Sequence, residues 1–146
     1  MFEKILYATD FSDVSKKALD YVKQLKDAGT KEVVVLHVID LGEFASTALD
    51  EGGALDIKKL KRDRDEHTTR EMGQIETELR KIGLKVKSRI ERGVPLRVIL
   101  RVEEEEDVSV VVLGSHGKGL LQEIFLGSVS EGIIRRSKRP VLVIRR

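Results

Sequence analysis

The hydrophobic residues of this chain follow two alternating spacings. Short apolar runs at residues 5–8, 33–39, 84–90, 108–113 and 141–144 are typical of strands. Between these runs, apolar residues recur every three or four positions, as they do on one face of a helix. Strands and helices therefore alternate along the chain, and this order predicts a parallel sheet with right-handed crossovers.

The predicted helices have recognisable ends. The first helix ends at Gly29 and the second, long and charged, at Gly83, because glycine readily takes the left-handed conformation that follows a helix. Pro95 fits the first turn of the third helix. The acidic run at residues 103–107, which opposes the dipole of that helix, is interpreted as a solvated corner. Gly132 inside the fourth helix costs about 1 kcal/mol relative to alanine, which predicts close packing on a neighbour.

Two glycine elements carry most of the functional information. Gly114 and Gly117 follow the fourth strand, where an open α/β sheet binds its ligands. Gly127 precedes the fourth helix, for which Ser128 is the predicted N-cap and Glu131 completes a capping box. Glycine permits φ > 0 and a close approach of the backbone to a phosphate, and a helix N-terminus favours an anion. Either glycine element alone would be interpreted as an ordinary turn, but together they predict a phosphate site.

An acid follows the first strand. In a sheet of this kind, the first strand ends beside the fourth, so Asp10 should lie near Gly114. A carboxylate there could hold a ribose hydroxyl or a Mg²⁺ ion that bridges phosphates. Alternatively, Asp10 and Ser12 only cap the helix that begins near Asp13.

The three histidines do not form a metal site. His37 ends the second strand, where a hydrogen-bonded structural role is favoured over a ligand role. His67 lies in the charged helix, and His116 lies in the glycine loop, where its ring could reach a phosphate or face the solvent. Since no histidine or acid pair has the spacing of a transition-metal site, we expect none.

Better-known phosphate and nucleotide motifs do not match. A Walker loop needs a second glycine before a Lys-Ser or Lys-Thr pair, and the dinucleotide fingerprint would need a glycine at Gln122. The Ser-Gly-Gly-x-Asp-Ser loop and the His-x-Gly-His element of related nucleotide-cleaving and nucleotidyl-transferring folds are also absent. A phosphoreceiver domain would need further acids beside Asp10. The phosphate site must therefore be of another kind.

Composition limits the remaining classes of function. A length of 146 residues suits a single domain spanning residues 1–146. No apolar run approaches the roughly 18 residues that span a bilayer, and the start does not resemble a secretion signal, so we expect a cytoplasmic protein without a membrane partner. Zero cysteines exclude disulfides and thiol catalysis. A net charge of +2 and an aromatic content of 4% argue against a nucleic-acid partner.

The chain resembles the ATP-binding branch of the universal stress proteins over nearly its whole length. The signature of that branch is Gly-x2-Gly-x9-Gly-Ser/Thr, and the glycine elements at residues 114–128 meet it without a gap. The opening at residues 5–12, the element at 36–38 and the ending at 137–144 are also similar to that family.

The resemblance implies a Rossmann-like open sheet of five parallel strands in the order 3-2-1-4-5, with helices on both faces. It also implies that the chain binds ATP together with Mg²⁺ or Mn²⁺. Val38 would meet the adenine through its backbone, and Asp10 would lie near the ribose or the metal. The complete set of implied nucleotide-binding residues is Ala8, Thr9, Asp10, Val38, Gly114, Ser115, His116, Gly117, Gly127, Ser128, Val129 and Ser130.

Three functions remain open: a nucleotide-dependent switch or stress-response regulator, a slow metal-dependent ATPase, and a scaffold that has lost its ligand. The glycine elements argue against the scaffold. The sequence offers no paired acids that would poise a base and no arginine in the glycine loop. We therefore expect a switch without catalytic residues, and at most a weak ATPase. Such a switch implies a protein partner, which the sequence does not identify.

The last strand is a candidate interface. Residues 141–144 are apolar on both faces, and in the implied strand order they lie at an edge of the sheet. An edge of this kind favours pairing with another strand, although Arg145 and Arg146 protect it to some extent. We expect a homodimer through this strand, as the resemblance also implies. The alternative is a monomer in which the loop after Asp40 covers the edge.

Overall fold

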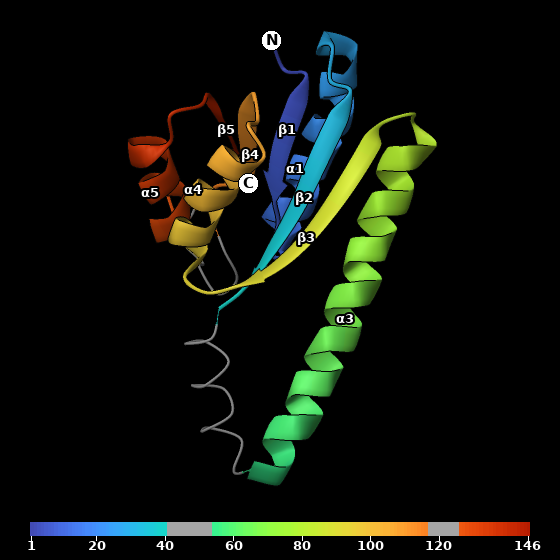
Figure 1. The fold of residues 1–146 in the computed structure, drawn as a ribbon, viewed down its shortest axis with the longest axis vertical. Helices are drawn as coiled ribbons and strands as arrows, with labels where there is room; N and C mark the ends of the chain where they lie inside the picture. Colours follow the sequence, from blue (N-terminus) through green and yellow to red (C-terminus); the bar gives the residue numbers. More distant parts are fainter. Residues whose placement is uncertain (41–53, 117–125) are drawn as a thin grey trace.

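Five strands form one parallel sheet in the order β3-β2-β1-β4-β5, which confirms the predicted fold class (Figure 1). The computed structural model describes residues 1–40, 54–116 and 126–146. The strands are β1 (Lys4–Ala8), β2 (Glu32–Ile39), β3 (Lys85–Arg92), β4 (Val110–Gly114) and β5 (Val141–Ile144).

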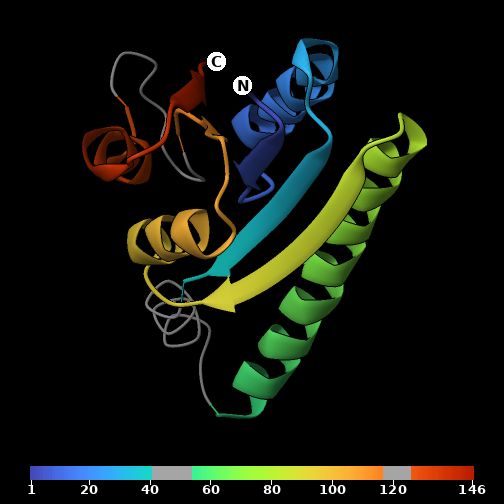
Figure 2. The same ribbon diagram turned by 45° about the horizontal axis from the view of Figure 1, so that its top comes forward.

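Helices cover both faces of the sheet (Figures 1 and 2). One face carries α1 (Asp13–Gln24), which continues into the 3-10 turn η1 (Leu25–Ala28), and α3 (Ala54–Lys81). The other face carries α4 (Pro95–Glu105) and α5 (Ser128–Arg136). Alternate residues of each strand enter the two layers: in β1, Ile5 and Tyr7 pack toward α1 and α3, and Leu6 packs toward α4 and α5.

Most of the predicted helix ends are present. Gly29 and Gly83 have φ angles of 102° and 90°, the left-handed conformation expected after a helix. Pro95 occupies the first turn of α4. A Cβ at Gly132 would lie 2.8 Å from both Cδ atoms of Leu96, so α4 and α5 approach closely, as the glycine inside α5 predicted.

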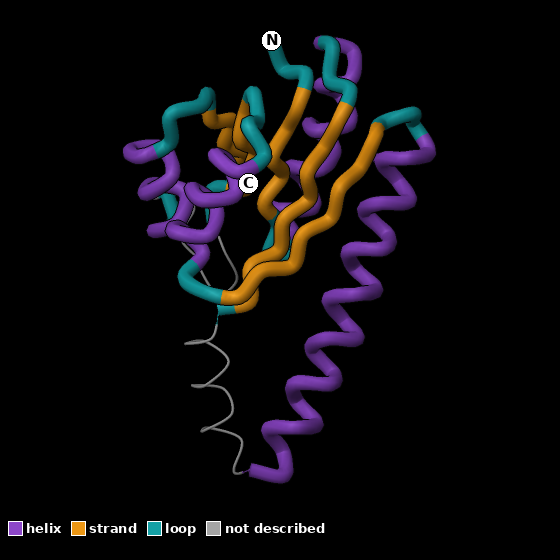
Figure 3. Tube along the Cα trace, in the orientation of Figure 1, coloured by secondary structure: helices purple, strands orange, loops and turns teal. Residues whose placement is uncertain are grey.

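Helix α3 extends beyond the sheet. Its carboxyl-terminal half is anchored by the buried side chains of Met72, Ile75 and Leu79, which pack in the same layer as α1. Toward its amino terminus, the helix continues past the end of β3 (Figures 1 and 3). The amino-terminal half of α3 therefore reaches the edge of the sheet where the strands end.

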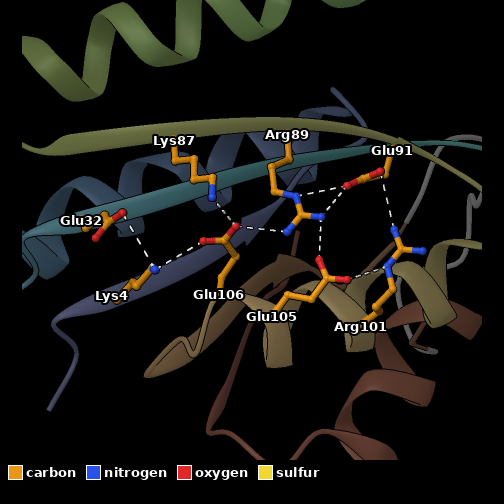
Figure 4. Close-up of polar contacts among 8 residues, drawn as sticks. All are labelled: Lys4, Glu32, Lys87, Arg89, Glu91, Arg101, Glu105 and Glu106. Atoms are coloured by element: carbon orange, nitrogen blue, oxygen red, sulfur yellow. Dashed lines mark hydrogen bonds and ion pairs between the residues drawn. The ribbon is translucent and has the colours of Figure 1, made fainter.

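A network of charged side chains joins β3 to α4 (Figure 4). Its centre is Glu106, which is 8% exposed and lies within ion-pair distance of Lys87 (2.7 Å), Arg89 (3.1 Å) and Lys4 (3.4 Å). The hydrogen bond from Lys87, followed by those from Lys4 and Arg89, lowers the pKa of Glu106. Hydrogen bonds to acids, the bond to Glu91 first, raise the pKa of Arg89.

The prediction that residues 103–107 form a solvated corner is therefore wrong for two of the acids, Glu103 and Glu106. Glu106 is enclosed by the cations of this network, and Glu103 is only 4% exposed. The Glu103 carboxylate accepts hydrogen bonds from the Ser137 hydroxyl (2.6 Å) and from the Lys138 amide (3.1 Å). Both acids fix the end of α4 to other parts of the chain. These partners are distant in sequence, so the residues next to the two acids did not reveal them.

None of the helices in the described part of the chain combines the length and the apolar character needed to cross a membrane.

Candidate functional site

A cavity of about 450 Å³ lies where β1, β2 and β4 end. A volume of this size falls within the usual range for small-molecule sites. The cavity receives lining residues from the three strand ends and from α1, α3, α4 and α5. It is lined by every residue of the predicted nucleotide-binding set except Ser115 and Gly117, namely Ala8, Thr9, Asp10, Val38, Gly114, His116, Gly127, Ser128, Val129 and Ser130. Gly117 lies outside the described residues.

Hydrogen bonds fix the loop between β1 and α1. The Thr9 amide donates to the carbonyl of Leu36 in β2 (2.9 Å), and the Thr9 hydroxyl accepts from the Phe11 amide (3.1 Å). The Asp10 carboxylate accepts from the Ser12 amide (3.0 Å), and Ser12 is the N-cap of α1. Asp10 thus shapes this turn, as the capping alternative proposed, and also lines the cavity.

The hydroxyl groups of Tyr7 and Ser15 are also held in place by hydrogen bonds near this loop. The Tyr7 hydroxyl, in a fully buried side chain, donates to the carbonyl of Ser15 (2.6 Å). The Ser15 hydroxyl in turn bonds to that of Thr9. Burial raises the pKa of Tyr7. The phenol therefore remains a neutral donor that secures the first turn of α1 beneath the cavity.

The two halves of the glycine motif meet in space. The Ser115 carbonyl accepts hydrogen bonds from the Gly127 amide and from the Ser130 hydroxyl, both at 2.7 Å. The Ser115 amide donates to the carbonyl of Ile144 in β5 (2.8 Å). Ser115 is fully buried and does not line the cavity, so its observed role is to join β4, β5 and the start of α5.

The predicted capping box of α5 is not formed. Gly127 is the N-cap and has no capping side chain, and Ser128 is the first residue of the helix. The Glu131 carboxylate pairs with Arg135 one turn later (2.8 Å). The prediction failed by one position, because the chain is still extended at Gly127 (φ −64°, ψ 158°). The first amides of α5 lack partners within the helix, so this end of the cavity still suits an anion.

The conformational reason given for Gly114 and Gly127 also needs correction. Neither glycine has a positive φ. Among the described residues, the glycines with a positive φ are Gly29, Gly83 and Gly93. At Gly114 the absence of a side chain matters for space, since a Cβ would lie 2.7 Å from Val14 Cγ1 and 3.2 Å from the Ser15 amide nitrogen. Gly114 therefore allows the start of α1 to approach β4.

All three histidines line the cavity. His37 Nδ1 lies 2.8 Å from the Thr9 carbonyl, which bears out the hydrogen-bonded role, and the ring also lines the cavity. His116 is 6% exposed, and its Nδ1 lies 2.6 Å from the Ser115 hydroxyl. His67, to which no role was given, lines the cavity from α3.

Sequence reasoning missed a set of lining residues on two helices. They are Arg64, His67 and Thr68 of α3 and Pro95 and Ile99 of α4. A signal for the first three was present, because their spacing continues the apolar stripe of α3 toward its amino terminus with polar residues. Such a change from apolar to polar on one helix face is typical of a helix that leaves the core and borders a cavity.

Within the described ranges, the structure contains no group of three or more histidine and acidic side chains that could hold a metal ion by itself. The carboxylate residues that line the cavity are Asp10 and Asp40. One carboxylate together with phosphate oxygens is a common way for Mg²⁺ to bind, so the residues fit a metal that arrives with a nucleotide.

The sequence has well-matched relatives. The universal stress protein family matches residues 1–145. The universal stress protein MJ0577 of Methanocaldococcus jannaschii is 39% identical over 156 residues, which cover 100% of this chain and 96% of that protein. The universal stress protein YxiE of Bacillus subtilis is 34% identical over 160 residues, which cover 99% of this chain and 100% of YxiE.

Solved structures show the same fold. That of MJ0577 superposes with a TM-score of 0.88 at 42% identity, covering 100% of this chain and 97% of that chain. A universal stress protein in complex with cAMP superposes at 23% identity (TM-score 0.60, 99% and 97% covered). A universal stress protein family protein from Arabidopsis thaliana with AMP bound does so at 19% (TM-score 0.64, 98% and 91% covered). At these lower identities the likeness concerns the fold alone.

The match over residues 1–145 and the full-length similarity to MJ0577 show that the chain belongs to the universal stress protein family.

Proposed function

We propose that the cavity binds ATP together with Mg²⁺ or Mn²⁺, and that the protein is a nucleotide-dependent switch in a stress response. The observation that carries this proposal is the convergence of both halves of the glycine motif with Asp10 and Val38 around one cavity. Structural neighbours solved with cAMP and AMP support an adenine nucleotide as the class of ligand.

The residues of the cavity suit the parts of a nucleotide. The start of α5 offers backbone amides to phosphate oxygens, and the Ser128 and Ser130 hydroxyls lie beside them. The side chains of Leu36, Ile99 and Leu113, which are buried, give the cavity apolar walls. In the arrangement that the family resemblance implies, the Val38 backbone would meet the adenine, and Asp10 would hold the ribose or the metal. A bound Mg²⁺ or Mn²⁺ would neutralise phosphate charge.

The slow ATPase is the alternative. Its support is Asp10, a carboxylate at the cavity that could position a metal or a water molecule. We favour the switch because the sequence of the glycine motif contains no arginine, although Asp40 lines the same cavity as Asp10.

Thermal melting with and without ATP and Mg²⁺ tests the binding. If ATP binds only the folded protein, it should stabilise the wild type by roughly 2.7 kcal/mol when present at 100 times its Kd. The Gly127→Val variant should lose this response and keep its fold. Valine can adopt the observed backbone of Gly127 (φ −64°), but its side chain would take room at a lining position. Gly73→Ala, in the exposed middle of α3, is the control.

No rise in the melting temperature of the wild type at millimolar ATP would refute the proposal. Chromatography of nucleotide released on denaturing freshly purified protein gives an independent check, since a bound adenine nucleotide should appear in it.

A further inference from the structure

Helix α3 contributes a wall of the cavity that the glycine motif does not include. This α3 wall consists of Arg64, His67 and Thr68, which lie on one face of the helix at positions i, i+3 and i+4. Thr68 is 3% exposed, and Arg64 and His67 are half-buried. The wall lies toward the amino-terminal half of α3, which extends beyond the sheet (Figure 1).

Three aromatic rings hold the α3 wall in register with the sheet. The His67 ring meets the Phe11 ring edge-on at 5.9 Å, and Phe11 stacks on His37 at 4.3 Å with an interplanar angle of 22°. Phe11 has a φ of 64°, a left-handed conformation that costs a residue with a side chain about 1–2 kcal/mol. These contacts connect α3 to the residue directly before Val38, so the wall is preorganised rather than loosely placed.

The α3 wall and the phosphate-binding elements lie at opposite ends of the cavity. Phe11, whose ring contacts His67 of α3, follows β1, and His37, which stacks on Phe11, lies near the end of β2. Gly114, by contrast, ends β4, His116 follows that strand, and Gly127 precedes α5. Since β1 lies between β2 and β4, two strand spacings, or about 10 Å, separate the end of β2, where His37 lies, from the end of β4. A nucleotide whose phosphates lie at α5 therefore extends its base toward α3.

We propose that Arg64 and His67 recognise the base of the nucleotide, which makes the α3 wall the selectivity element of the site. This inference rests on the proposed nucleotide binding. Adenine presents ring nitrogens that accept hydrogen bonds and an amino group that donates them. Arginine offers a planar fork of donors, and a neutral histidine offers one donor and one acceptor. The wall thus has the groups needed to distinguish one base from another.

Calorimetric titration of variants with ATP and with tripolyphosphate, which lacks a base, tests this assignment. Arg64→Leu and His67→Leu should each weaken ATP binding roughly tenfold, the loss of about one good hydrogen bond, and leave tripolyphosphate binding unchanged. Arg70→Leu, an exposed arginine of the same helix, is the matched control and should change neither affinity. Unchanged ATP affinity in both variants, or a parallel loss of tripolyphosphate affinity, would overturn the inference.

A second measurement needs no substitution. In wild-type protein, ATP should slow amide hydrogen exchange at residues 62–68 of α3, and tripolyphosphate should not. If the wild type binds ATP and this exchange stays the same, the inference fails and the proposed function stands. If the wild type does not bind ATP at all, both fail.

Discussion

Gly114 at the end of β4 lies directly against Val14 in the first turn of α1. A Cβ at position 114 would be 2.7 Å from Val14 Cγ1 and 3.2 Å from the Val14 carbonyl carbon. The side chain of Val14 is almost fully buried, and the carbonyl carbon belongs to a helical backbone, so neither can move aside at low cost. The first glycine of the glycine motif is therefore a packing residue.

Replacing this glycine should destabilise the protein in the absence of any ligand. We expect Gly114→Ala to lower the free energy of unfolding by about 1–3 kcal/mol, because the added methyl group overpacks the contact with α1. Denaturant unfolding with an unchanged m-value measures this loss.

A glycine-to-alanine substitution at a position with open space is the control. Nothing lies within 4 Å of a Cβ at Gly73 in α3, so Gly73→Ala should raise the free energy of unfolding by up to about 1 kcal/mol. Equal stability of Gly114→Ala and the wild type would show that the contact with Val14 relaxes freely and that the glycine serves the ligand alone.

The sequence was sufficient for the fold and for many of the residues that line the cavity. Alternating strand and helix patterns determined a parallel sheet, and the resemblance implied the strand order that the structure shows. The position of Gly114 and Asp10 at the cavity followed from the rule that ligands bind where parallel strands end. Such predictions succeed because each depends on local patterns and on topology.

Features that depend on contacts between distant segments were missed. The acid at Glu106 looked solvated because its cationic partners come from β1 and β3. The spatial reason for Gly114 required the position of α1, and the α3 wall required knowing how far α3 continues past the sheet. For Glu106 and Gly114, no spacing within a single segment carries this information.

The network around Glu106 should make stability depend on pH. The pKa of Glu106 is lowered in the folded protein, chiefly by Lys87, so its contribution is complete above the ordinary pKa of glutamate and is lost as the pH falls through the folded value. We expect Glu106→Gln to cost about 1–3 kcal/mol at neutral pH, because it leaves three cations without their shared acid.

The same series of unfolding curves contains its own control. Glu104, two residues earlier and within α4, is 71% exposed, and its ion pair with Lys138 is 3.7 Å long. Glu104→Gln should therefore change the free energy of unfolding by less than about 0.5 kcal/mol. If Glu106→Gln loses stability equally at pH 7 and at pH 3, the assignment of the loss to the Glu106 carboxylate is wrong.

Turnover of ATP should be negligible. We expect fewer than about one event per minute, because an arginine finger alone is worth roughly 10³ to 10⁵ in rate, and the described part of the glycine motif has none. Phosphate release by freshly purified protein, followed over hours with Mg²⁺ or Mn²⁺, measures this. Sustained release that disappears in Asp10→Asn would make the protein an ATPase and assign Asp10 to the reaction.

The last strand should join two copies of the chain. Val141, Leu142 and Val143 are half-buried in β5, which pairs only with β4 among the described strands and so forms one edge of the sheet. Parallel pairing uses alternate residues: the carbonyls of Pro140 and Ile144 accept hydrogen bonds from β4. The backbone groups of Val141 and Val143 consequently face away from β4, toward a strand that could pair there.

This alternation provides a substitution that separates dimerisation from folding. Val143→Pro removes an amide that faces outward, which an edge strand tolerates, whereas Leu142→Pro removes an amide on the side of β4 and should destabilise the sheet. We expect the wild type to sediment at about twice the chain mass of 16.5 kDa and Val143→Pro to sediment as a folded monomer. If two copies pair about a two-fold axis, the β5 strand of each copy covers the exposed edge of the other. A wild-type monomer at tens of micromolar protein would contradict the dimer. A dimer that persists in Val143→Pro would place the interface on another surface.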